Sequence, residues 1–282
     1  MTHQPLRKLF ATALVLLAPM FAATPLRAQT DVDLDSEWGG RLSFNLDKKL
    51  ARGLHVALDE EVRFDNNFSA FDRFHTTLGL SYKANRHLKA GIGYAMINSY
   101  STAHSSFKDS RHRLMLDVTG SMSWGDWRLS LKERIQGTYR AGEMNEYQEA
   151  RTVYLLKSRL KLQYKGLPKM EPYASIELRN TLNAPVISAY YNGTSYLTED
   201  YSYEGEAGWF LAGFSNVYLN RVRGTLGAEY RLSRHSKIDV AFLLDYKMDK
   251  VVDANAEGTK LKSYTYETGF VGWLSASYKY SF

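Results

Sequence analysis

Hydrophobic and polar residues alternate along most of the chain, from Trp38 to the carboxyl terminus. Successive side chains of a β-strand point to opposite faces, so each alternating run of about ten residues predicts a strand with one apolar and one polar face. Short polar turns join these runs in pairs, at 47–53, 84–87, 124–126, 165–170 and 232–236. Longer loops separate the pairs, near 99–110, 139–150, 183–216 and 249–263. The pattern predicts an array of β-hairpins.

The last five residues continue this alternation to the end of the chain. Tyr278, Tyr280 and Phe282 share one face of the expected strand, while Lys279 and Ser281 share the other. This ending resembles the carboxy-terminal signal that outer-membrane proteins present to their assembly machinery. An ordinary amphipathic edge strand would show the same pattern, so the amino terminus has to be considered with it.

The amino terminus has the features of a secretory signal peptide. Arg7 and Lys8 precede an apolar run over 9–23, and Leu26-Arg27-Ala28 follows as a cleavage site. We therefore predict that residues 1–28 are removed and that residues 29–282 form a single domain. No later segment contains the roughly 18 apolar residues of a transmembrane helix. If the mature chain enters a membrane, we expect it to do so as strands.

The composition argues against several classes of partner and site. The 36 Lys and Arg residues against 30 Asp and Glu include three basic residues and no acidic residue in the signal segment, which leaves a mature net charge of about +3. So small an excess argues against a nucleic-acid partner. The chain has no Cys, which excludes disulfides, thiolate metal sites and a lipoprotein anchor. No nucleotide, haem or zinc signature occurs, so we expect no cofactor and no metal.

These features predict an all-β fold, a transmembrane antiparallel up-and-down β-barrel in the outer membrane of a Gram-negative bacterium. The 20 Tyr, 13 Phe and 5 Trp residues suit strands and membrane interfaces. Short turns of such barrels face the periplasm, so Phe282 belongs at the periplasmic rim, where its strand pairs with the first strand. We expect contacts with outer-membrane lipid, lipopolysaccharide and the assembly machinery, and the sequence leaves the oligomeric state open.

The number of strands follows less directly from the alternation. The alternation identifies eleven strands, an odd number that would start the first strand on the extracellular side. We predict twelve strands, within a range of 10–12. Either the acidic segment 31–37 forms another strand or crosses the lumen, or a hairpin lies within 183–216.

Two carboxylates do not follow the alternation. Glu60 and Glu133 fall on faces that are otherwise apolar. This position predicts either a β-bulge that shifts the phase or a partner that the sequence does not reveal.

Several short motifs resemble the bacterial family of outer-membrane barrels named domain of unknown function 2490. The motifs cover nearly the whole mature chain: Trp38, Glu61-Val62-Arg63, Gly79-Leu80-Ser81-Tyr82-Lys83, Gly93-Tyr94, Pro172-Tyr173, Glu177-Leu178, Arg221-Val222-Arg223 and Gly227-Ala228-Glu229-Tyr230. The resemblance implies an outer-membrane location and implies no known activity.

The main candidate site is the predicted lumen, because the inward positions are strongly charged. The basic residues expected there are Arg111, Arg113, Arg128, Lys132, Arg134, Lys157, Arg159, Lys161, Arg221, Arg223 and Arg231. The acidic residues expected there are Asp59, Glu61, Asp117, Glu177, Glu229, Asp239 and Asp245. Two interpretations are open: a narrow channel that prefers anions, or ion pairs that fill the small interior.

Two further candidates lie in loops. His104 and Ser106 offer a base and a hydroxyl close in sequence, as a lipid-active hydrolase requires. Several other serines lie in the same loop, so a His and a Ser can be neighbours there by chance. The segment 183–216 is rich in aromatic and acidic residues and could bind a surface sugar or a divalent cation, fold inward as a plug, or cap the barrel. We favour a non-enzymatic barrel, either structural or a narrow anion channel.

Overall fold

The structure is a computed structural model. It describes residues 32–33, 37–102, 104–145, 148–184, 189–191, 196–198, 209–211, 217–256 and 261–282. The predicted signal peptide, residues 1–28, lies outside the described residues, so its removal stays a prediction. Among the described residues, no helix is long and apolar enough to cross a membrane.

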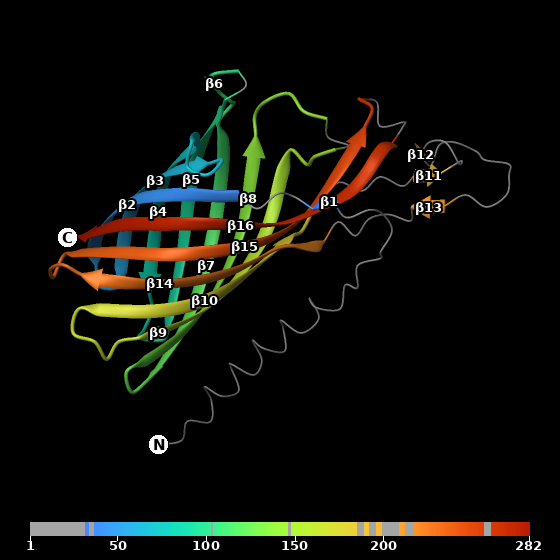
Figure 1. Ribbon diagram of the computed structural model, residues 1–282. Coiled ribbons are helices and arrows are strands. Elements are labelled where there is room, and N and C mark those ends of the chain that lie inside the picture. The colour runs from blue at the N-terminus through green and yellow to red at the C-terminus, as the bar shows by residue number, and fades with distance from the viewer. Residues whose placement is uncertain are drawn as a thin grey trace. The chain divides into compact units, whose positions relative to one another are not determined.

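Eleven long strands form a closed barrel (Figure 1). In chain order they are β2 (Glu37–Ala51), β3 (Leu54–Asp65), β4 (Ala70–Lys83), β5 (Leu88–Ser101), β7 (Arg111–Trp124), β8 (Trp127–Arg140), β9 (Thr152–Tyr164), β10 (Met170–Thr181), β14 (Tyr218–Arg231), β15 (Ser236–Ala254) and β16 (Leu261–Ser281). Each strand pairs antiparallel with the next of this series. The predicted all-β up-and-down barrel is confirmed.

The barrel closes through a parallel pairing of the last strand with the first. Tyr278 of β16 lies opposite Phe44 of β2, and their rings stack with centroids 5.7 Å apart. The backbone N–H of Phe282 donates to the carbonyl oxygen of Asp47 at 2.9 Å. A parallel seam is what an odd number of up-and-down strands requires, because the first and last strands then run in the same direction.

The acidic segment 31–37 contributes a short additional strand. In β1 (Val32–Asp33) the two residues pair parallel with Glu267 and Thr268 of β16. Eleven long strands and β1 therefore agree with the predicted number. In the segment 183–216, β11 (Ala189–Tyr191), β12 (Tyr196–Thr198) and β13 (Trp209–Leu211) form a separate three-stranded sheet and do not extend the barrel.

The hairpin turns lie where the sequence predicts them. The β2–β3 turn is tighter than expected and consists of residues 52 and 53. Gly53 adopts a positive φ of 79°, and Gly125 in the β7–β8 turn adopts 52°, values at which a glycine is strongly favoured. A two-residue strand, β6 (Ser106–Phe107), pairs with the end of β5.

Apolar side chains cover the outside of the barrel, as the alternation predicts. Leu114 is 63% exposed, Leu116 58% and Leu226 64%, whereas Val271 and Trp273 point inward and are buried. So large an exposed apolar surface is unfavourable in water and suits a lipid environment. The fold is therefore that of a transmembrane barrel.

Both carboxylates on the apolar face have hydroxyl partners on a neighbouring strand. Thr76 donates to Glu60 at 2.9 Å, and Ser158 donates to Glu133 at 2.6 Å. The pairing register does not shift at either position. Of the two explanations offered by the sequence, the partner is correct and the bulge is wrong.

The inward Trp273 determines which residue can stand beside it on β2. A Cβ added to Gly39 would lie 2.4 Å from the Trp273 ring and 2.8 Å from the carbonyl oxygen of Phe64. The ring and the backbone of β3 thus occupy the space that a side chain at position 39 would need.

We expect Gly39→Ala to destabilise the barrel by about 1–3 kcal/mol, because overpacking forces the seam strands apart. The measurement is urea-induced unfolding of protein refolded in lipid vesicles. Gly120→Ala is the matched control, since a Cβ at Gly120 meets nothing within 4 Å. Equal unfolding midpoints for the two variants would contradict the prediction.

Candidate functional site in the barrel lumen

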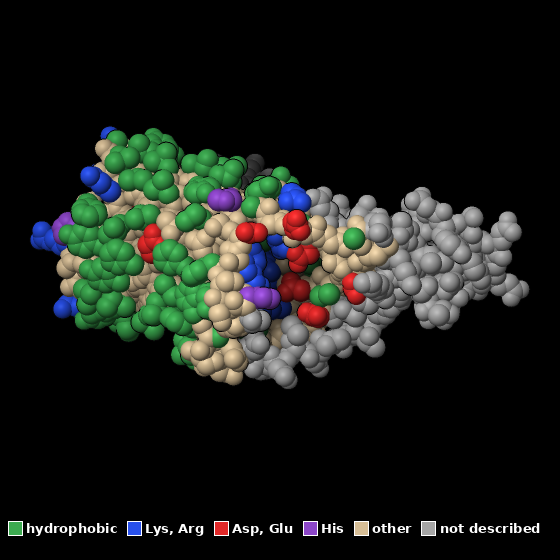
Figure 2. Space-filling model, turned by 90° about the horizontal axis from the view of Figure 1, so that it is seen from above, with side chains coloured by type: hydrophobic (Ala, Val, Ile, Leu, Met, Phe, Trp, Pro, Cys, Tyr) green, Lys and Arg blue, Asp and Glu red, His purple; other side chains and the backbone are tan. Residues whose placement is uncertain are grey.

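The lumen of the barrel is strongly charged. Figure 2 shows hydrophobic side chains over the barrel wall and, beside them, a hollow with Lys and Arg side chains at depth and Asp and Glu side chains around its rim. The basic side chains come from the alternate positions of strands whose other face is apolar. The strand alternation therefore separates an apolar exterior from a charged interior.

The positive charge is concentrated on three adjacent strands. Eight of the eleven basic residues predicted for the lumen lie on β7, β8 and β9: Arg111, Arg113, Arg128, Lys132, Arg134, Lys157, Arg159 and Lys161. Of the seven predicted acidic residues only Asp117 is on these strands, and the other six are on β3, β10, β14 and β15. We call the inward face of β7–β9 the cationic wall.

One row of cations crosses from this wall to the next strands. Five residues of β8, β9, β10, β14 and β15 stand directly opposite one another in register: Arg134, Lys157, Arg179, Arg221 and Lys247. Like charges in directly opposite positions repel each other. The row therefore depends on carboxylates, or on anions, close to it.

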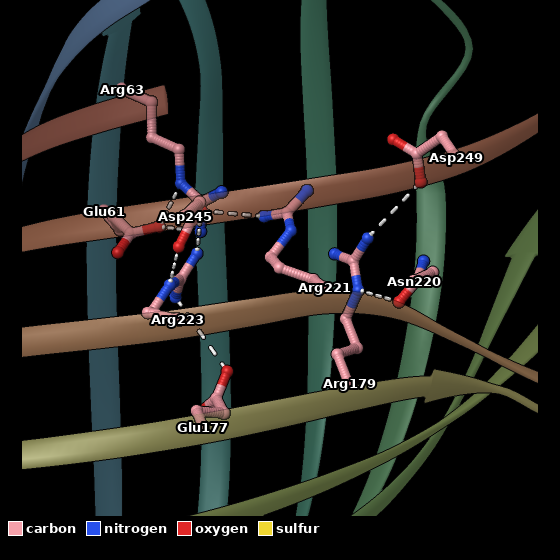
Figure 3. Close-up of polar contacts among 9 residues, drawn as sticks. All are labelled: Glu61, Arg63, Glu177, Arg179, Asn220, Arg221, Arg223, Asp245 and Asp249. Atoms are coloured by element: carbon pink, nitrogen blue, oxygen red, sulfur yellow. Dashed lines mark hydrogen bonds and ion pairs between the residues drawn. The ribbon is translucent and has the colours of Figure 1, made fainter. Parts of the chain in front are cut away.

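Asp245 of β15 neutralises the part of the row on β14. It is fully buried and lies between Arg221 and Arg223 (Figure 3). Arg223 donates through Nε at 2.5 Å and through Nη2 at 2.7 Å, and Arg221 donates at 3.1 Å. Two-point binding of this kind is the strongest geometry for a guanidinium and a carboxylate. Asp245 thus holds two strands of the lumen together.

Other predicted lumen residues form similar pairs. Asp117 accepts two hydrogen bonds from Arg134, at 2.6 and 2.8 Å, and lies 2.8 Å from Nζ of Lys132. Lys161 donates to Glu229 at 2.8 Å, which joins β9 to β14 across β10. Arg231 pairs with Glu171 at 2.8 Å. The packed network expected from the sequence therefore accounts for six of the eleven basic residues.

The other five predicted basic residues have no carboxylate within 4 Å in the described part of the chain. Arg113 donates to the hydroxyl of Thr138 at 2.9 Å, and Arg128 donates to that of Ser121 at 3.1 Å. The remaining three of this group are Arg111, Lys157 and Arg159. All five lie on the cationic wall, so this wall keeps an excess of positive charge.

The predicted acidic residues lie on the inward faces of their strands, and their partners are of several kinds. Glu61 pairs with Arg63 at 2.5 Å, and Glu177 lies 3.9 Å from Arg223. Asp59 accepts from Asn45 at 3.2 Å, and Asp239 accepts from the Tyr173 hydroxyl at 2.9 Å.

The structure adds charged residues that the sequence list omits. Arg41, Arg63, Arg179 and Glu171 all occupy inward positions. Arg41 is 6% exposed and stacks over the Trp273 ring at 4.4 Å. The alternation around Val62 places Arg63 on the polar face, and the alternation around Leu42 places Arg41 there in the same way.

The loop candidates are not assembled into a catalytic arrangement by the described residues. His104 makes a hydrogen bond with the hydroxyl of Ser101 at 3.1 Å, and its partner is therefore not Ser106. The side chains of 185–216 lie outside the described residues, so a role for this segment stays a prediction. No group of His, Asp and Glu in the described chain could hold a metal ion.

A known protein family and solved structures are similar to the chain. A family model described as "Protein of unknown function (DUF2490)" matches residues 39–195. No curated protein matches the chain. Among solved structures, the outer-membrane expressed OmpT of Vibrio cholerae is similar at 11% identity and a TM-score of 0.36, over 82% of this chain and 62% of that one. A NanC porin is similar at 11% identity and a TM-score of 0.43, over 86% and 96% of the two chains.

We expect Asp245→Asn to lower the free energy of unfolding by about 3–5 kcal/mol, because it leaves two buried guanidinium groups without their counter-charge. Urea titration in lipid vesicles measures the change. Asp59→Asn removes a lumen carboxylate that has an amide partner and no ion pair among the described residues, and serves as the control. The prediction is wrong if the two substitutions cost the same.

Proposed function

The chain belongs to the DUF2490 family of proteins of unknown function, and from its lumen we propose that it is an outer-membrane barrel that conducts small anions. The proposed location is supported by the secretory amino terminus and the aromatic ending at Tyr278, Tyr280 and Phe282. The apolar exterior supports it further. With the short turns in the periplasm, the long loops face outside.

The observation that carries the anion preference is the cationic wall. Five of its basic side chains have no carboxylate within 4 Å in the described chain, and the only inward carboxylate of the wall, Asp117, is shared by Lys132 and Arg134. A charge that faces water inside a low-dielectric tube acts over a longer distance than a surface charge, because the walls confine its field. The lumen therefore attracts anions and repels cations.

A purely structural barrel is the main alternative. It accounts for the pairs around Asp245, Asp117 and Glu229, which fill and stiffen the interior. It gives no reason for Arg111, Arg113, Lys157 and Arg159, because each could be a neutral polar residue at a lower electrostatic cost. The excess of unneutralised charge favours conduction over packing alone.

We expect purified protein in planar bilayers to open channels whose reversal potential, under a KCl gradient, shows a preference for chloride. Arg113→Gln should weaken this preference, because it removes a wall charge that no carboxylate neutralises. The control is Arg234→Gln, which removes the same charge from an exposed residue of the β14–β15 turn. Absence of conductance steps, or equal reversal potentials for both variants and the unmodified protein, would overturn the proposal.

A further inference from the structure

Two neighbouring cations of β9 form no ion pair with any described carboxylate. Lys157 and Arg159 occupy successive inward positions of the strand, and neither makes an ion pair or a hydrogen bond through its side chain with another described residue. Arg159 is exposed to the lumen, whereas Lys157 is partly buried. Strand geometry separates their Cα atoms by roughly 6.6 Å, two residues at about 3.3 Å each.

The neighbouring strands supply one carboxylate, Glu177, which attracts both cations but forms no ion pair with either. Lys157 stands between Arg134 and Arg179 in register, so the residues directly opposite it are both basic. Arg159 stands between Lys132 and Glu177. The carboxylate of Glu177 lies 3.9 Å from Arg223 of the next strand and forms no ion pair with Arg159.

Arg113 of β7 adds a third positive charge to the same region. Its Nε donates to Thr138, and it is close enough to Lys157 for their charges to repel. Holding three such groups together is unfavourable. A bound anion would lower this cost, because its charge is opposite to that of the cluster.

Carboxylates are the ligands that arginines already bind in this lumen. Arg134 holds Asp117, and Arg223 holds Asp245, each through Nε and Nη2. The planar guanidinium of Arg159 offers the same two-point geometry to a carboxylate that comes from solution. Lys157 provides a compact charge for a second negative group.

We infer that Lys157 and Arg159 bind a solute with two separated carboxylates, a small aliphatic dicarboxylate. This inference names the solute class of the proposed anion channel and therefore rests on the proposed function. A dicarboxylate fits better than a single oxyanion because the two cations project from different positions along the strand. One carboxylate pairs with Arg159, the other with Lys157, and Arg113 strengthens the field at the site.

The test compares anions of similar length as blockers of the chloride current. We expect glutarate to half-block the current at a concentration about tenfold below that of butyrate, because its second charge meets a second cation in a medium of reduced dielectric. Lys157→Gln and Arg159→Gln should each remove about that tenfold advantage. Arg234→Gln should leave it unchanged. Lys157→Arg keeps the charge and should retain the block. It therefore separates the loss of charge in Lys157→Gln from a folding defect.

The outcomes separate this inference from the proposed function. If the channel prefers chloride but glutarate and butyrate block equally, or if the two substitutions do not change the block, the dicarboxylate site is wrong and the channel stands. Block by inorganic phosphate as strong as that by glutarate would also overturn it, because one oxyanion would then suffice. If no conductance occurs, the channel is wrong, and calorimetric titration of the detergent-solubilised protein with glutarate decides the site alone.

Discussion

Every other feature of the molecule depends on the closure of the sheet between β16 and β2. A strand edge left open in lipid would expose N–H and C=O groups that nothing there can satisfy. The parallel pairing of Tyr278 with Phe44, and the bond from Phe282 to Asp47, remove both edges. Once the sheet is closed, the two faces of every strand become an outside and an inside. The alternation of the sequence is then a list of lipid-facing and lumen-facing side chains.

The alternation could be read from the sequence because it is local. It correctly placed the short turns, the inward Trp273, the outward Leu114 and Leu116, and the closing role of the last strand. The separate sheet of β11, β12 and β13 could not be read in the same way, since pairings of three residues leave no periodic pattern. The position of the short strand β1 depends on where the pairing of β16 with β2 ends. That point in turn depends on the register of the entire barrel.

Partners were harder to predict than faces, because they depend on register and on distances across the lumen. Lys161 binds Glu229, 68 residues away and two strands over. The two outward carboxylates show the same limit. Glu60 and Glu133 interrupt apolar faces in the sequence, and only the strand pairing shows that Thr76 and Ser158 stand directly opposite them. A hydroxyl on the next strand satisfies a carboxylate without disturbing the ladder, so no bulge is needed.

The uneven distribution of charge separates the residues that stabilise the barrel from those that we assign to anion binding. Around Asp245 the barrel follows the rule for buried charge, with each guanidinium matched to a carboxylate oxygen. Lys157 and Arg159 of β9 do not follow it, although Glu177 stands directly opposite Arg159. Glu177 lies within 4 Å of Arg223 instead, so these two cations have no carboxylate at ion-pair distance among the described residues. Selection for stability alone would favour neutral residues at such positions. A lumen cation without a carboxylate at ion-pair distance is available to bind an anion that enters the lumen. The spacing of such cations along β9 determines which anions fit.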